Sequence, residues 1–145
     1  MRAQVSFEYI SLFTLLLIPL AVAFLYSYAA VFQATSAYKI ETSLDKLAQN
    51  AEELYVQGPG AKSIVTIDLP SGINAHGSFI GNSSGGPGRY IMLNFSGSNA
   101  VRITRATVQG YWPNTTGGYV RPGILQMNLT VDNNNIVIMR PLRSG

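Results

Sequence analysis

Apolar side chains are concentrated near the start of the chain. Residues 4–32 read QVSFEYISLFTLLLIPLAVAFLYSYAAVF, and no charged residue occurs from Tyr9 to Tyr38. At a rise of about 1.5 Å per residue, this uncharged stretch predicts a helix about 45 Å long. A bilayer core requires only about 20 apolar residues, so the predicted helix is long enough to span a membrane. Pro19 lies inside it and is expected to kink or loosen it locally.

A different pattern follows over residues 36–57. Apolar residues recur there at intervals of three and four positions, which is the period of one helix face: Ile40, Leu44, Leu47, Ala51 and Leu54. Charged residues flank this stripe. We therefore expect the helix to continue as an amphipathic segment and to end at Gly58-Pro59-Gly60, because glycine accepts left-handed dihedral angles and proline cannot extend the hydrogen-bond ladder.

The rest of the chain, residues 61–145, has the pattern of short strands. Alternating, β-branched stretches separated by Gly, Pro, Asn and Ser predict strands at 63–69, 78–80, 89–95, 100–108 with an extension over 109–112, 124–131 and 136–139. Asp132-Asn133-Asn134-Asn135 predicts a closing hairpin. The predicted fold class is α+β, in which a long N-terminal helix carries a small antiparallel sandwich or curled sheet, and the amphipathic stripe covers the open face of that sheet.

Glu8 stands at the edge of the apolar run, where a carboxylate is costly unless a cation pairs with it. The surrounding residues, Gln4-Val5-Ser6-Phe7-Glu8-Tyr9-Ile10-Ser11-Leu12, fit the pattern Q-x-S-x-E-x-x-x-L. This pattern resembles the class III signal peptide of archaeal type IV pilin-like proteins. The resemblance is specific because the motif is N-terminal and directly precedes a long apolar run.

The resemblance implies a processing step and an assembly role. A prepilin peptidase would recognise Gln4, Ser6, Glu8 and Leu12 and cut between Ala3 and Gln4, so that residues 1–3 are a leader and Glu8 becomes the fifth residue of the mature chain. Residues 4–35 would then anchor the subunit in the cell membrane and later pack into a surface filament. The implied partners are the membrane, other copies of the chain or related subunits, the peptidase and the pilus assembly machinery. A β-rich extracellular head after the helix is also expected.

Cleavage at Ala3–Gln4 would create a free α-amino group, whose pKa is about 7.7–8.0 in model compounds. In a filament of stacked helices, this amine on Gln4 could pair with Glu8 of a neighbouring subunit. The pair would offset the cost of burying both charges and would fix the axial register. The alternative is an ordinary membrane anchor with Glu8 in the headgroup layer.

Charge is distributed unevenly along the chain. The net charge is +3, and charged residues make up only 12% of the sequence. Residues 1–60 hold three basic and five acidic residues, a net charge of −2, whereas residues 61–145 hold seven basic and two acidic residues, a net charge of +5. A basic distal region is compatible with binding to anionic surfaces, glycans or nucleic acid, and equally with simple solubility.

Four N-glycosylation sequons follow the apolar helix. Asn82 and Asn114 fall in predicted loops and are the better candidates, whereas Asn94 and Asn128 fall in predicted strands.

Catalytic chemistry is not expected. The stretch Gly81-Asn82-Ser83-Ser84-Gly85 matches G-x-S-x-G, but Gly86-Pro87-Gly88 follows where the nucleophile elbow requires a helix. His76 is the single histidine and is expected in a loop, and the chain has no cysteine, so we expect neither a metal site nor a cofactor. Arg102 and Arg105 are three positions apart in a strand and are expected on opposite faces, so they form no basic patch by themselves.

The sequence therefore predicts a structural subunit of an archaeal type IV pilus-like surface filament that serves attachment, and not an enzyme. A cleaved secretory signal is disfavoured because the apolar core of such signals spans only about 7–15 residues, and the apolar run of this chain is much longer. Two alternatives remain: a minor pilin or a non-polymerising membrane-anchored surface protein, and a membrane-tethered domain that binds glycans or extracellular nucleic acid. Nucleic acid is not expected as a partner of the pilin itself.

Overall fold

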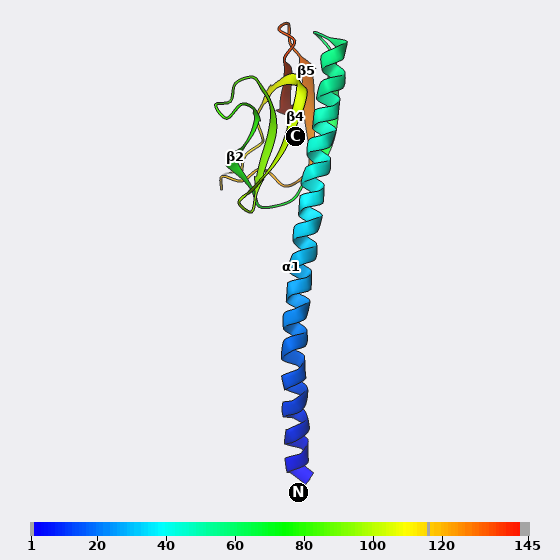
Figure 1. Ribbon diagram of the computed structural model, residues 1–145, viewed down its shortest axis with the longest axis vertical. Helices are drawn as coiled ribbons and strands as arrows, with labels where there is room; N and C mark the ends of the chain where they lie inside the picture. Colours follow the sequence, from blue (N-terminus) through cyan, green and yellow to red (C-terminus); the bar gives the residue numbers. More distant parts are fainter. Residues whose placement is uncertain (1, 116, 143–145) are drawn as a thin grey trace. The chain divides into compact units, whose positions relative to one another are not determined.

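The computed structural model describes residues 2–115 and 117–142, with side chains from residue 9 onward. Over this range it contains one helix and six strands (Figure 1). In chain order these elements are α1 (Arg2–Gln57), β1 (Lys62–Leu69), β2 (Ile73–Gly81), β3 (Gly88–Phe95), β4 (Ser98–Gly110), β5 (Gly123–Val131) and β6 (Val137–Pro141). The protein is therefore α+β, as the sequence predicts.

The chain forms two compact units, Met1–Thr35 and Ser36–Gly145. Helix α1 contributes to both, and the boundary falls where the continuous apolar run gives way to the amphipathic stripe. The predicted end of the helix is confirmed. Gly58 has a φ of 86° and its N–H donates to the carbonyl of Leu54 at 3.1 Å, which is the left-handed cap that glycine accepts without strain.

The amphipathic half of α1, residues 36–57, packs on the sheet. The five residues of the predicted stripe are each at most 3% exposed: Ile40, Leu44, Leu47, Ala51 and Leu54. They belong to the same core cluster as the inner side chains of the strands. Figure 1 shows this part of α1, coloured cyan to green, running alongside β4 and β5. The stripe prediction is confirmed, and burial against the sheet is what stabilises this half of the helix.

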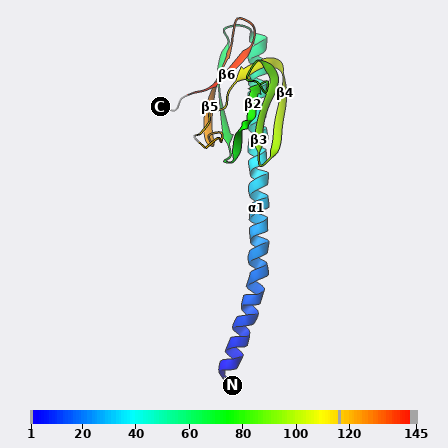
Figure 2. The same ribbon diagram turned by 90° about the vertical axis from the view of Figure 1, so that its left-hand side faces the viewer.

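All six strands belong to one curled sheet in the order β1-β5-β6-β4-β2-β3, with an additional pairing between β4 and β3 (Figure 2). Most pairs are antiparallel, including the predicted β5–β6 hairpin, in which Val131 pairs with Val137. The exception is β4–β6, which is parallel over Val108–Gly110 and Val137–Met139. The sheet is thus mixed, and the prediction of a wholly antiparallel sandwich is not confirmed.

The long connection after β4 explains the parallel pair. Residues 111–122 carry the chain from the end of β4 to the start of β5, and the β5–β6 hairpin then places β6 beside β4. Since β6 runs antiparallel to β5, it takes the direction of β4. The expected strand extension over 109–112 stops at Gly110. Trp112 instead leaves the sheet, is 4% exposed, and donates its indole N–H to the carbonyl of Met92 at 3.2 Å.

Alternation along the strands separates a buried from a solvent-facing side. In β1 the buried residues are Val65, Ile67 and Leu69. In β5 they are Leu125, Met127, Leu129 and Val131. The register pairs Val65 with Met127 and Ile67 with Leu125, so these residues share one face. That face and the stripe of α1 form the core of the second unit.

Candidate functional site: the apolar half of the N-terminal helix

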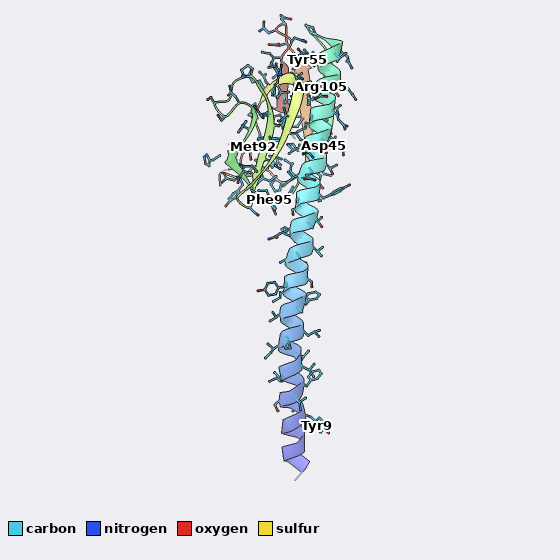
Figure 3. The ribbon with its side chains drawn as sticks, viewed as in Figure 1. Tyr9, Asp45, Tyr55, Met92, Phe95 and Arg105 are labelled. Carbon is cyan, nitrogen blue, oxygen red and sulfur yellow. The ribbon has the colours of Figure 1, made fainter. Side chains whose placement is uncertain are left out.

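The apolar half of α1, residues 4–35, has no described side chain that is buried within its own unit. Every residue from Tyr9 to Thr35 is exposed, and the large apolar side chains between Tyr9 and Phe32 are each 45–76% exposed. Ser36, at 4%, is the first buried residue. Figure 3 shows side chains standing out from the ribbon along this part of the helix. Such a surface requires a lipid or protein partner to remove it from water.

Two threonines of this half have hydroxyl groups that suit an apolar environment. The hydroxyl of Thr14 donates to the carbonyl of Ile10, and that of Thr35 donates to the carbonyl of Val31, each at 2.8 Å. A hydroxyl bonded to the preceding turn needs no water, so these threonines do not oppose burial. Helix α1 runs through Pro19 without a break. From Tyr9 to Gln57 the helix is long and apolar enough to cross a membrane, judged by length and composition alone.

The residues of the signal-peptide motif lie at the start of this half. Ala3, Gln4, Ser6 and Glu8 have helical backbone, but their side chains lie outside the described residues, so the pairing proposed for Glu8 and Gln4 stays a prediction. Leu12, the last position of the motif, is described and is 62% exposed.

Polar contacts hold the amphipathic half of α1 on the sheet at two strands, β1 and β4. On the β1 side, the Nζ of Lys39 lies 2.7 Å from Oδ2 of Asp68, and the hydroxyl of Ser43 donates to the carbonyl of Asp68 at 3.0 Å. On the β4 side, the guanidinium of Arg102 donates to both carboxylate oxygens of Asp45, from Nε to Oδ1 and, at 3.3 Å, from Nη2 to Oδ2. These contacts fix the rotation of the helix about its axis.

The Asp45–Arg102 pair also shifts the pKa of both side chains. The hydrogen bond from Arg102 lowers the pKa of Asp45 below its ordinary value of 3.8, although partial burial opposes the shift. The same bond raises the pKa of Arg102. Both side chains are more than a third exposed, so solvent screens the pair and its contribution to stability is small.

Glu52 has a role that the sequence pattern does not reveal. Strand β4 leaves its pairing with β3 after Ile103 and resumes at Val108, and in the intervening bulge the backbone N–H of Arg105 donates to Oε1 of Glu52 at 2.9 Å. Figure 3 labels Asp45 and Arg105, which lie on α1 and β4. Glu52 therefore satisfies a strand donor that has no ladder partner. Arg102 reaches α1 and Arg105 is exposed, which agrees with their predicted opposite faces.

The four sequon asparagines differ in access. Asn114 is exposed beside the Asn114–Val120 bridge. Asn82 is exposed, but its side chain organises the turn after β2 by accepting from the N–H groups of Ser84 and Gly86. Asn94 and Asn128 are partly buried within strands. Asn114 is thus the most accessible candidate, and glycosylation itself stays a prediction.

The remaining candidate chemistry finds no catalytic setting in the described residues. Gly81 is the last residue of β2, Asn82 to Gly85 lie in the turn before β3, and a strand rather than a helix follows. His76 was expected in a loop, and this expectation is wrong, since it lies exposed in β2. Within the described residues, no three His, Cys, Asp or Glu side chains come together as a metal site.

Comparison with known proteins found no match: no protein-family model, no curated protein and no solved structure matches the chain.

Proposed function

We propose that this chain is a structural subunit of an archaeal type IV pilus-like surface filament. The observation that carries the proposal is the combination of an entirely exposed apolar helix half, from Tyr9 to Thr35, with the Q-x-S-x-E motif directly before it. Exposed helix alone would suit any membrane anchor. The motif favours a subunit that is cleaved and then assembled.

Energetics supports a role in which the apolar half is always covered. Sixteen large apolar side chains between Tyr9 and Phe32 are exposed. Full burial of each contributes about 1.5–3 kcal/mol, so the sum is tens of kcal/mol. That exceeds the total stability of a typical domain, about 5–15 kcal/mol. In the proposed cycle, lipid covers this half before assembly, and the helices of neighbouring subunits cover it afterwards.

The absence of charge from Tyr9 to Tyr38 makes Glu8 the charge that must be matched in the filament. Proteolysis at Ala3–Gln4 would supply the matching cation as a new α-amino group. Pairing between the amine of one subunit and Glu8 of the next would favour one axial register, because any other register leaves a buried carboxylate unpaired.

Purified surface filaments test this function. Filaments sheared from the source cells and digested for mass spectrometry should contain this chain as a subunit, and deletion of its gene should remove or alter them in electron micrographs. Recovery of the chain from the membrane fraction alone, with filaments unchanged by the deletion, would favour a membrane-anchored surface protein instead.

A further inference from the structure

A groove of about 530 Å³ lies in the second unit, at the end of the sheet where β4 passes into β5. Its walls come from the 111–122 connection, from the start of β5, and from the end of β6 with Leu142. The lining residues used below are Tyr111, Pro113, Arg121, Pro122, Gln126 and Leu142. The volume falls in the range of small-ligand sites, and the wall combines apolar side chains with polar groups, as such sites do.

The walls of the groove are held in place by the fold. Trp112 and Val120, at 4% and 1% exposure, anchor the 111–122 connection in the core. Its two arms pair through a hydrogen bond from the N–H of Arg121 to the carbonyl of Pro113 at 2.9 Å. On the opposite wall, the N–H of Leu142 donates to the carbonyl of Gln126 at 2.8 Å. Both walls of the groove are therefore fixed before a ligand binds, which lowers the entropic cost of binding.

Tyr111 also lines a second hollow of about 420 Å³, together with Gln109 and Arg140. The tyrosine is 57% exposed and contributes to both. Each hollow contains one arginine, Arg121 in the first and Arg140 in the second, and each contains one glutamine.

This arrangement matches a particular chemistry. A guanidinium binds a carboxylate through two parallel hydrogen bonds, and a glutamine amide both donates to and accepts from hydroxyl groups. The tyrosine ring and the proline rings offer flat apolar surface to the C–H face of a ligand ring. A ligand with a carboxylate, several hydroxyls and an apolar ring face is an acidic sugar.

We propose that the two hollows lined by Tyr111 bind neighbouring acidic sugar units of an extracellular polysaccharide. Each unit places its carboxylate against one arginine and its hydroxyls against one glutamine, and the chain of sugars passes over Tyr111. Single-stranded nucleic acid fits less well, because its binding sites combine a continuous basic track with several stacking rings, and Tyr111 is the single aromatic residue in the described lining. The site does not depend on whether the chain polymerises.

Binding of a uronic acid polymer to the full-length chain in detergent micelles tests the proposal. The probes are polygalacturonate, its fully methyl-esterified form and single-stranded DNA, each titrated by calorimetry. Polygalacturonate should bind, and the neutral ester should bind about tenfold more weakly or worse, since about 1.4 kcal/mol of lost charge pairing corresponds to tenfold.

Variants locate the site. Tyr111→Ala and Arg140→Gln should each weaken polygalacturonate binding about tenfold. Gln126→Glu, which adds a carboxylate to the groove, should weaken binding of polygalacturonate more than binding of the ester. Tyr90→Ala and Arg105→Gln are matched controls, because both residues are exposed on strands and line neither hollow.

The controls should bind as the wild type does, and all variants should keep the wild-type circular dichroism spectrum. A chain that binds no polygalacturonate would overturn the proposal. So would equal losses in the control and groove variants, or single-stranded DNA that binds more tightly than polygalacturonate and depends on Tyr111.

Discussion

Leu47 and Leu16 allow the same substitution to be made at two contrasting positions of one helix. Leu47 is fully buried in the stripe that packs on the sheet, whereas Leu16 is 64% exposed in the apolar half. Replacing a buried leucine by alanine removes its transfer free energy and leaves a cavity, which costs about 2–5 kcal/mol. We expect Leu47→Ala to lower the free energy of unfolding by that amount and Leu16→Ala to leave it nearly unchanged.

Trp112 provides the signal for this measurement. It is the single tryptophan of the chain, is 4% exposed and is bonded to Met92, so its fluorescence reports unfolding of the second unit. Urea titrations of the full-length chain in a mild detergent should shift the midpoint of Leu47→Ala strongly at an unchanged slope. A loss below about 1 kcal/mol for Leu47→Ala, or an equal loss for Leu16→Ala, would refute the packing of the stripe on the sheet.

Three further predictions address charge, autonomy and assembly. Because the pKa of Asp45 is lowered in the folded protein, this carboxylate stabilises the fold above its ordinary pKa of 3.8 and loses the effect as the pH falls through the folded value. Asp45→Asn should therefore cost about 0.2–1 kcal/mol at pH 7 and nothing at pH 2 in urea titrations. An equal cost at both pH values would contradict the ion-pair account. A fragment of residues 36–145 should fold as a monomer with mixed helix and strand by circular dichroism and gel filtration, because the stripe covers the sheet without the apolar half, and an aggregated product would contradict this. Glu8→Gln should be cleaved yet fail to enter filaments, since breaking a buried charge pair costs about 3–5 kcal/mol, and wild-type levels of assembly by cleaved Glu8→Gln would refute the pairing.

Local patterns predicted the elements of the fold well. The spacing of Ile40, Leu44 and Leu47 identified the buried helix face, because a helix brings residues three and four apart onto one side. Alternation located β1, β3 and β5 to within one residue at each end. Strand β2 is longer than predicted, since Asn74 to Gly77 have low strand preference and the register with β3 shifts between Asn74 and Phe79.

These local patterns did not predict how strands pair when a long connection joins them. The parallel β4–β6 pair depends on how residues 111–122 cross the sheet, and side-chain alternation carries no information about strand direction. The contacts of Asp45 and Glu52 with β4 were missed for a related reason, because acidic residues that flank an apolar stripe look alike whether they face solvent or a strand. The groove beside Tyr111 likewise depends on the conformation of the connection.

The mature N-terminus is the most direct test of the account. Intact-mass spectrometry of subunits from isolated filaments distinguishes cleavage before Gln4 from every other start. The same measurement is made on the membrane fraction of cells that lack the prepilin peptidase. The proposed function predicts a chain that begins at Gln4 in filaments and an uncleaved chain confined to the membrane without the peptidase. A chain that keeps Met1, or that begins near Ala30 after removal of the apolar half, would contradict the proposed function.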